Sequence, residues 1–412
     1  MLAVIYMVQY VINDGGNDLY IYRLGAETIT DGPGGPGLYE GSLDNYPFTY
    51  PPFAALLFIP FALMPKEVGM ALMMLITAGI AWWLGWVITR YVSRRGVRIP
   101  LYEHLGTAGC ASTLALLIWA SGPWRLTTHF GQINAVILLL VLADFLRPAT
   151  RVPRGVLIGI AGGIKLTPLA FGLILLMRKD WRGVASVAGG FVGTIALGFL
   201  AVPGEAAYYW GVAVRNTSRI GVTAFYDNVS LTGIFAHQGV PEPIATVLVV
   251  ALSLFLLVAT AALMRLFIRA NMVFSQVALN AFLMLQISPI SWSHHNTWYP
   301  VLLVALCLEI FPLIMPAARP VVYVLSAFAS VIALVGMYIS PFWLAVLFSP
   351  KYSSHEMIYL PQGGAGLVAG SAPYAAMYLV VALVFLTYWA HRAAIDARVD
   401  SGRFRAPERP AP

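Results

Sequence analysis

Residues 155–177 read GVLIGIAGGIKLTPLAFGLILLM, an apolar stretch with a single charged residue, Lys165. Basic residues typical of a cytoplasmic loop lie on both sides of it, at 147–154 and at 178–182. A helix needs about 20 apolar residues to cross a bilayer, so the stretch is too short to cross twice. The chain must leave the membrane on the side by which it entered. We therefore predict a re-entrant hairpin, with Lys165-Leu-Thr-Pro168 near its tip and sheltered from lipid.

The composition of the whole chain indicates a membrane protein. Hydrophobic residues make up 59% of the 412 residues, charged residues only 10%, and the mean hydropathy is +0.77. Soluble globular proteins contain about 25% charged residues, so this chain cannot cover a water-facing surface of its size. The composition excludes a soluble protein and predicts a polytopic membrane protein. Basic cytoplasmic loops explain the net charge of +7, and we expect no nucleic-acid partner.

Other apolar runs are long enough, or nearly so, to cross the membrane as helices. They are 67–91, 104–121, 131–146, 183–202, 241–264, 271–291, 297–316, 320–346 and 366–391. The short run 1–12 is interpreted as the outer half of a first transmembrane helix. We expect an all-α fold with about ten full crossings plus the broken pair at 155–177. Residues 1–391 would form one membrane domain, followed by a basic cytoplasmic tail at 392–412.

The basic residues set the orientation. Most of the 25 Lys and Arg residues fall in alternate loops and in the tail, and the positive-inside rule makes those loops and the C-terminus cytoplasmic. The opposite loops are then external: 13–66, 122–130, 203–240, 292–296 and 347–365. The first of these is long for a connection. Its aromatic content and the Gly-Pro stretch at 31–37 predict two membrane-surface helices joined by a turn cluster.

The external loops collect ionisable side chains, which are functional-site candidates near a membrane. Asp18 has two interpretations, a helix N-cap or a general base that takes a proton from an acceptor hydroxyl. His294 and His295 either solvate an interfacial loop or stabilise a departing phosphate. We find no further ligands at a spacing suited to a metal, so we expect no metal and no cofactor.

Three further basic residues have equally open roles. Lys165 either extends its ammonium group toward the interface or lies among polar neighbours at the hairpin tip. Arg215 and Arg219, four residues apart, would meet either lipid headgroups or a substrate phosphate.

Six short motifs occur in order along the chain. They are Asp18-Leu-Tyr-Ile-Tyr22 with Gly25-Ala26, Pro47-Phe-Thr-Tyr-Pro-Pro52, Gly131-Gln-Ile-Asn134, Ile164-Lys-Leu-Thr-Pro168, Asn228-Val-Ser230 and Ser288-Pro-Ile-Ser-Trp-Ser-His-His295. Together they resemble glycosyltransferase family 87, actinobacterial enzymes of the GT-C class that include mycobacterial phosphatidylinositol mannoside mannosyltransferases. The chain departs from the family at the short run 1–12, where the family has a complete first helix.

The resemblance implies a GT-C fold, polyprenyl-phosphate-mannose as donor and an α-1,2-mannosidic product. The acceptor would be a glycolipid of the phosphatidylinositol mannoside or lipomannan type, reached in a site that is embedded among membrane lipids. The catalytic acidic residue of the first external loop maps to Asp18, and the paired histidines of the family map to His294 and His295. Substrate binding is expected of the other motif and loop residues: Tyr22, Tyr50, His129, Gln132, Asn134, Lys165, Arg215, Arg219, Asn228, Ser230 and Trp292.

The implied chemistry is a single in-line displacement, because a β-linked donor gives an α-linked product. One carboxylate near the acceptor hydroxyl is then enough, as in inverting glycosidases. Phosphate is a good leaving group, so positive charge beside it helps more than a general acid does. Two other functions remain open: a lipid-linked arabinosyl- or glucosyltransferase of the same fold, and a transporter. The broken stretch favours a transporter slightly, whereas the missing internal repeat and the polar loops on one side do not.

The loop assignment predicts a labelling pattern. In a chain whose native Cys110 and Cys307 are replaced by Ser, Gly35→Cys should react with an impermeant maleimide on intact cells, because 13–66 is expected outside. Arg151→Cys should react only after the membrane is opened. Labelling at 151 without labelling at 35 would overturn the arrangement.

Overall fold

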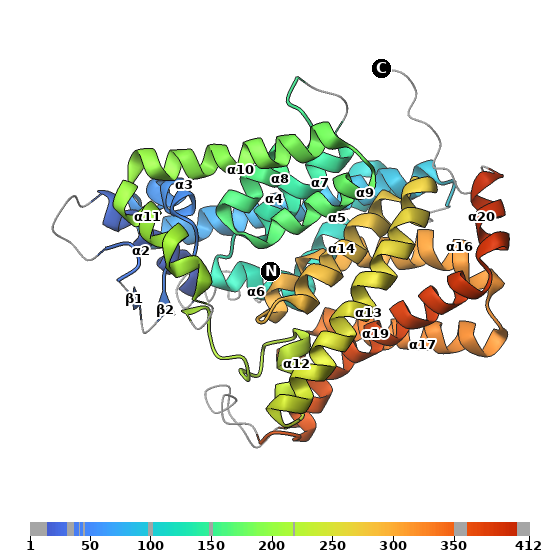
Figure 1. The fold of residues 1–412 in the computed structure, drawn as a ribbon. Helices are drawn as coiled ribbons and strands as arrows, with labels where there is room; N and C mark the ends of the chain where they lie inside the picture. The colour runs from blue at the N-terminus through green and yellow to red at the C-terminus, as the bar shows by residue number, and fades with distance from the viewer. Residues whose placement is uncertain are drawn as a thin grey trace. The chain divides into compact units, whose positions relative to one another are not determined.

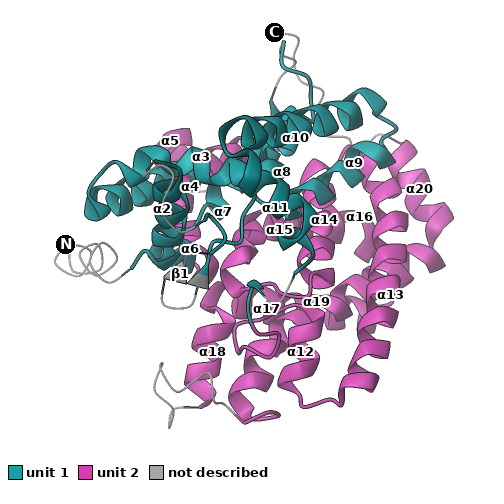
Figure 2. Ribbon diagram, turned by 60° about the vertical axis from the view of Figure 1, so that its left-hand side comes forward, with its two compact units in different colours: residues 1–80, 125–221 teal, residues 81–124, 222–412 magenta. Residues whose placement is uncertain are grey.

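The computed structural model describes residues 15–30, 37–40, 42–43, 46–97, 102–147, 151–216, 219–349 and 361–401. The predicted first half-helix at 1–12, most of the turn cluster at 31–37 and the tail beyond residue 401 lie outside the described residues. The chain divides into two compact units, each built from two separate segments (Figure 2). Unit 1 comprises residues 1–80 and 125–221, and unit 2 comprises residues 81–124 and 222–412.

Unit 1 carries residues 13–66, predicted to form an external loop, and the broken stretch 155–177. Its helices are α2 (Asn17–Thr30), α3 (Pro52–Ala62), α7 (Asn134–Leu146), α8 (Val156–Ile164), α9 (Gly172–Met177), α10 (Trp181–Ala201) and α11 (Pro203–Gly211). A small antiparallel ladder joins β1 (Ser42–Leu43) to β2 (Tyr46–Pro47). The helix α2 packs on α3, and α8 packs on both α7 and α10 (Figure 1). The two helices predicted in the first external loop are thus α2 and α3.

Unit 2 holds both long and short helices. They are α5 (Tyr102–Ala120), α12 (Leu231–His237), α13 (Glu242–Arg269), α14 (Val273–Ile287), α15 (Tyr299–Val304), α16 (Phe311–Ile314), α17 (Pro320–Ile339), α18 (Pro341–Phe348), α19 (Ala365–Ala390) and α20 (Arg392–Asp400). Both α4 (Lys66–Arg94) and α6 (Gly122–Phe130) contribute residues to each unit. The helix α19 packs against α17, α18 and α13.

A buried carboxylate fixes one end of unit 2. Glu309 is 1% exposed, and its Oε2 atom accepts hydrogen bonds from the backbone N–H of Ser275 at 2.7 Å and from the Ser275 hydroxyl at 2.6 Å. Its Oε1 atom accepts from the Tyr91 hydroxyl and lies 3.4 Å from the guanidinium of Arg95. Since an unpaired buried charge is costly, these bonds tie the second half of α4 to the start of α14.

The number of helices that can cross a membrane is lower than predicted. Among the described residues six helices are long and apolar enough, or seven if the consecutive helices α5 and α6 count as one span. The runs 131–146 and 271–291 form α7 and α14, with 13 and 15 residues, or about 20 and 23 Å at about 1.5 Å per residue. Both are shorter than the roughly 30 Å of hydrocarbon in a bilayer. The expectation of ten full crossings is therefore not confirmed.

Local backbone signals explain where these helices stop. Gly131 has a φ of 66°, a left-handed conformation that suits glycine and prevents α7 from extending back to this residue. Ser288 is extended at the end of α14, as expected before Pro289. The run 320–346 is divided at Ser340, where φ is 97° and Pro341 begins α18.

The stretch 155–177 is broken where the sequence predicts it. The helix α8 ends at Ile164, Lys165 is extended with φ −148° and ψ 129°, and the chain resumes as a 3₁₀ turn over Thr167–Phe171 that leads into α9. Pro168 occupies the start of this turn, where its missing N–H is not needed. The break is confirmed, and its depth in the membrane stays a prediction.

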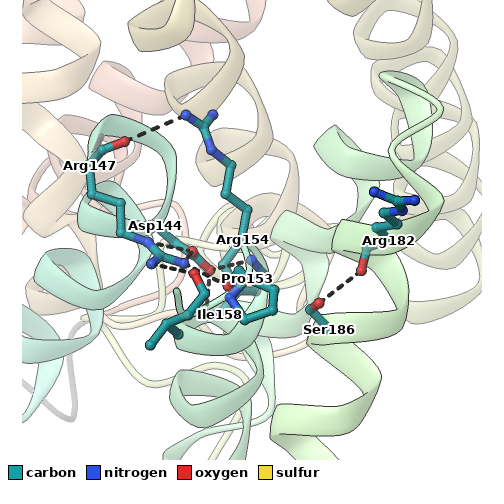
Figure 3. A network of polar contacts seen from close by, with 9 residues as sticks. Asp144, Arg147, Pro153, Arg154, Ile158, Arg182 and Ser186 are labelled. Carbon is teal, nitrogen blue, oxygen red and sulfur yellow. Dashed lines mark hydrogen bonds and ion pairs between the residues drawn. The ribbon is translucent and has the colours of Figure 1, made fainter. Parts of the chain in front are cut away.

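The beginning of α8 is held by a buried carboxylate. Asp144, 1% exposed at the end of α7, accepts hydrogen bonds from the backbone N–H groups of Gly155 at 2.8 Å and Ile158 at 3.2 Å (Figure 3). The guanidinium of Arg147 pairs with the same carboxylate at 2.9 Å and donates to the carbonyl groups of Val152 and Pro153. A negative charge at a helix N-terminus is stabilising, so Asp144 fixes where α8 starts.

Glycines let α8 and α10 approach closely. A Cβ atom at Gly159 would lie 2.4 Å from the carbonyl oxygen of Val187, and one at Gly163 would lie 2.1 Å from the Thr194 hydroxyl oxygen. Both distances are far inside van der Waals contact. Small residues at such contacts are the usual means of close helix packing in membranes.

The close packing of α8 against α10 predicts that two Gly→Ala substitutions will have different effects on stability. Gly159→Ala should lower the free energy of unfolding by about 1–3 kcal/mol, the usual cost of overpacking, because the clash is with backbone. Gly189→Ala on α10, whose Cβ would meet nothing within 4 Å, should be neutral or raise it by about 0.5–1 kcal/mol. Thermal unfolding of the two purified variants in detergent measures the difference. Equal midpoints would contradict the close packing.

Candidate active site

The start of α2 is fixed by the residue before it. Gly16 has a φ of 98°, its N–H donates to the carbonyl oxygen of His129 at 2.7 Å, and its own carbonyl oxygen accepts from Tyr20 N–H at 2.8 Å. Gly16 is therefore the N-cap of α2. The alternative that Asp18 is the N-cap is wrong, because Asp18 lies within the first turn of the helix.

Asp18 is part of a connected group of polar side chains. Its carboxyl interacts with Lys165 and with Gln132, and both lower its pKa against the effect of burial. The Gln132 Oε1 atom lies 2.8 Å from the Tyr22 hydroxyl, the Gln132 Nε2 atom lies 3.2 Å from the Tyr50 hydroxyl, and the two tyrosine hydroxyls are 3.1 Å apart. These residues come from α2, from the segment before α3 and from the segment before α7.

Lys165 reaches the same group from the break after α8. Its ammonium nitrogen lies 3.4 Å from the Asn134 Oδ1 atom and 5.8 Å from the centre of the Tyr50 ring. The extended backbone at Lys165 turns the side chain out of the helical path. We call Asp18, Tyr22, Tyr50, Gln132, Asn134 and Lys165 the Asp18 group.

Burial and charge act against each other in the Asp18 group. Burial raises the pKa of the Asp18 carboxyl to about 6, against the lowering effects of the Lys165 charge and of the hydrogen bond with Gln132. Burial lowers the pKa of the Lys165 ammonium to about 8, and the Asp18 charge opposes this. A carboxyl with a pKa near neutrality is suited to exchange protons with a substrate. A lysine so placed can bind an anion.

Arg215 and Arg219 lie outside the Asp18 group. The Arg219 guanidinium donates to the carbonyl oxygen of Tyr39 at 2.9 Å and lies 5.4 Å from the centre of the Tyr39 ring. Arg219 therefore braces the segment between α2 and α3. Arg215 is exposed at the end of a 3₁₀ turn. His129 contacts the site through its backbone, since its carbonyl oxygen accepts from Gly16, and its ring lies beside Phe130.

The paired histidines lie in unit 2, in a 3₁₀ turn over Ser293–Trp298 that we call the histidine turn. The two rings are nearly perpendicular, with centres 4.7 Å apart. His294 is 6% exposed and His295 is half-buried. The backbone N–H of Trp292 donates to His295 Nδ1 at 3.2 Å. Because Nδ1 accepts, the neutral His295 ring carries its proton on Nε2.

Asn228 and Ser230 hold the segment before the histidine turn. The Asn228 amide donates to the carbonyl groups of Thr223 and Pro289, at 2.8 and 3.1 Å, and accepts from the N–H groups of Ser230 and Ser291, at 3.2 and 2.9 Å. The Ser230 hydroxyl donates to the same Pro289 carbonyl at 3.1 Å. Both side chains are 0% exposed, so they hold the segment before the histidine turn in place.

The sequence reasoning did not select Asp227 as a site residue. Its Oδ2 atom accepts from the backbone N–H of Ser293 at 3.2 Å, at the first residue of the histidine turn. Burial raises the pKa of this carboxyl to about 7. In the sequence Asp227 is one of the ionisable residues of the predicted loop 203–240, next to Asn228, but this position does not reveal the contact with Ser293.

Most of the predicted site residues thus form two groups, the Asp18 group within unit 1 and the histidine turn with its supports within unit 2. His129, Arg215 and Arg219 belong to neither group. Within the described ranges, no three His, Cys, Asp or Glu side chains gather as a metal site would require. The absence of a metal from the reaction stays a prediction.

Comparison with known proteins decides the family. Residues 48–289, more than half of the chain, match the description "Glycosyltransferase family 87". The chain belongs to glycosyltransferase family 87. Of the two groups, Tyr50, Gln132, Asn134, Lys165 and Asn228 lie inside the matched residues, whereas Asp18 and both histidines lie outside them. Their catalytic roles therefore depend on the motif resemblance.

Curated relatives agree with this assignment. The chain is 33% identical over 291 residues to a polyprenol-phosphate-mannose-dependent alpha-(1-2)-phosphatidylinositol mannoside mannosyltransferase of Mycobacterium tuberculosis, covering 68% of this chain and 67% of that protein. It is 32% identical over 310 residues to the protein of the same name in Mycolicibacterium smegmatis, covering 70% and 69%. A pentamannoside mannosyltransferase of the latter species is 31% identical over 304 residues, covering 70% and 69%. No solved structure matches the chain.

Membership of family 87 makes the chain a membrane-embedded glycosyltransferase. This outcome selects the enzyme over the transporter among the functions left open by the sequence. For this family 87 enzyme, the Asp18 group offers a carboxyl that can accept a proton beside a lysine that can bind an anion.

Proposed function

We propose that this family 87 enzyme transfers mannose from polyprenyl-phosphate-mannose to a phosphatidylinositol mannoside on the external side of the membrane, forming an α-1,2 linkage. The observation that carries the proposal is the similarity to the three mycobacterial relatives, whose names share this donor and this linkage. The external side follows from the basic loops and the positive-inside rule.

Asp18 is the general base in this proposal. Its pKa of about 6 leaves the carboxyl ionised at neutral pH while keeping it basic enough to take the proton of an acceptor hydroxyl. The first turn of α2 holds it in place, and the interaction with Gln132 favours its ionised form. Inversion at the sugar carbon needs no second carboxylate and no covalent intermediate.

Positive charge and N–H donors stabilise the departing phosphate. Lys165 supplies a charge in the Asp18 group. His295 supplies an Nε2–H donor, because its Nδ1 atom accepts from Trp292, whereas His294 is the more buried of the pair. Asn228, Ser230 and Asp227 act on the reaction indirectly by holding the histidine turn.

A transfer assay tests the proposal. Membranes that contain the enzyme are given radiolabelled polyprenyl-phosphate-mannose and a panel of acceptors, and the linkage of the product is analysed. We expect transfer to phosphatidylinositol mannosides with an α-1,2 bond. Transfer from a polyprenyl-phosphate arabinose or glucose donor, or transfer to lipomannan alone, would reassign the donor or the acceptor.

The substitution Asp18→Asn tests whether Asp18 is the general base. Asn keeps the size and the hydrogen-bonding oxygen of Asp but cannot take a proton, so turnover should fall by about 10²–10⁴ with normal expression and donor binding. Glu27→Gln in the same helix, a half-exposed residue paired with Arg23, is the matched control and should keep activity. Transfer by Asp18→Asn within a few-fold of wild type would show that the base is misassigned.

Substitutions of the two histidines should affect turnover and stability differently. His295→Ala should lower turnover by about 10²–10³, the effect of losing one electrostatic stabiliser, and His294→Ala should act more through the stability of the turn. Turnover rates and unfolding midpoints of the two variants separate these effects. Full activity of His295→Ala would refute its role, and activity that is lost with chelator and restored by a divalent ion would point to a metal instead.

A further inference from the structure

The Tyr50 hydroxyl oxygen accepts two hydrogen bonds within the Asp18 group. One comes from the Tyr22 hydroxyl at 3.1 Å and the other from the Gln132 Nε2 atom at 3.2 Å. The Tyr22 hydroxyl also donates to Gln132 Oε1 at 2.8 Å, so its single proton is shared in a three-centre bond. Tyr22 is 0% exposed and Gln132 is 2% exposed, so burial fixes both donors in place.

The proton of the Tyr50 hydroxyl takes no part in either bond. A phenol oxygen has one proton and two lone pairs, and here both lone pairs accept. Among the described residues no group accepts a hydrogen bond from this hydroxyl. Burial raises the pKa of Tyr50 above its ordinary value, so the hydroxyl keeps its proton at neutral pH. Tyr50 is half-buried and can therefore offer a ligand a donor, and only a donor.

Lys165 places a second donor-only group near the Tyr50 ring. Its ammonium nitrogen lies 5.8 Å from the ring centre and 3.4 Å from Asn134 Oδ1, and an ammonium group has no acceptor. A phosphate group is complementary to this pair, because its charged oxygens only accept. A sugar hydroxyl is less suited, because neither group can accept its proton. That proton suits the Asp18 carboxylate instead.

We propose that the Tyr50 hydroxyl donates a hydrogen bond to a phosphate oxygen of a lipid substrate, beside Lys165, and that Tyr22 and Gln132 hold the hydroxyl in position. The proposal rests on the proposed function, in which the polyprenyl donor and the phosphatidylinositol acceptor both carry a phosphate. Tyr50 is then a residue that contacts substrate. Tyr22 and Gln132 act through it, although the motif resemblance implies substrate binding for all three.

Binding of two mannose-free phosphate lipids tests the proposal and identifies the source of the phosphate. The probes are decaprenyl phosphate, which matches the donor, and phosphatidylinositol, which matches the acceptor. Their Kd values are measured with the full chain in a phosphate-free maltoside detergent. Tyr50→Phe removes only the hydroxyl and keeps the ring beside Tyr22 and Phe48, whose ring centres lie 4.9 and 5.7 Å away. It should weaken one of the two probes by about 10–100-fold, the effect of losing a hydrogen bond to a charged group.

Turnover separates the two sources of the phosphate. If the phosphate is the departing polyprenyl phosphate, kcat of Tyr50→Phe should fall as well, because negative charge grows there in the transition state. If the phosphate belongs to the acceptor, KM for the acceptor should rise by a similar factor and kcat should change by less than about threefold.

Two further variants test the same contact if Tyr50→Phe fails to fold. Lys165→Gln should weaken the same probe. Tyr22→Phe removes one of the two bonds to the Tyr50 oxygen and should weaken that probe by about two- to fivefold. Unchanged affinity in both variants would contradict the proposal.

Tyr208→Phe is the matched control, because it makes the same substitution on α11 at a side chain that is 45% exposed. It should change Kd and kcat by less than about twofold. If Tyr50→Phe binds both probes as the wild type does, the proposal is wrong, and a raised KM for the acceptor would then show that the hydroxyl binds sugar. Neither probe contains mannose, so transfer of arabinose or glucose would refute the proposed function and leave the phosphate contact standing.

Discussion

The site depends on the place where the helix α8 ends and the backbone becomes extended at Lys165. A backbone N–H or C=O group that is shielded from water needs a partner inside the protein, and the N–H of Lys165 still donates to the carbonyl oxygen of Ala161 at 3.0 Å. The glycines of α8 let α10 come close enough to cover the broken segment, and Asp144 fixes the start of α8 so that the break falls at Lys165. The site depends on this arrangement, because the same extended backbone directs the lysine toward Asn134 and Asp18.

The electrostatics of the Asp18 group follow from that placement. Burial alone would neutralise both members of the pair, raising the pKa of the carboxyl and lowering that of the ammonium. Their mutual attraction opposes both changes. Between about pH 6 and pH 8 both groups stay charged, although each is removed from bulk water. The fold therefore holds a carboxylate that can accept a proton, Asp18, near an ammonium group that can bind an anion, Lys165, and shields both from bulk water.

Local sequence patterns predicted that helices and breaks are present better than they predicted the residues at which helices begin and end. The break at Lys165-Leu-Thr-Pro168 was predictable, because a lysine and a proline inside an apolar run between basic flanks leave few alternatives. The lengths of α7 and α14 were not, since counting apolar residues does not detect where Gly131 or Ser288 takes the backbone out of the helix. Asp18 was selected through the family pattern. The contacts among Tyr22, Tyr50 and Gln132 join segments up to 110 positions apart, and no local pattern encodes such a contact.

The interleaving of the two units has a consequence for synthesis. Residues 81–124 belong to unit 2 but are followed by the 97 residues 125–221 of unit 1 before the rest of unit 2 is made. Arg95 precedes its partner Glu309 by 214 residues, which corresponds to about 10–40 s at a translation rate of about 5–20 residues per second. During that interval the second half of α4 and α5 can contact each other, as Trp82 and Ser112 do at 3.3 Å, but Arg95 lacks its partner Glu309. Because of this order of segments, α4 and α5 must stay in the membrane as a pair until the later helices of unit 2 have been translated.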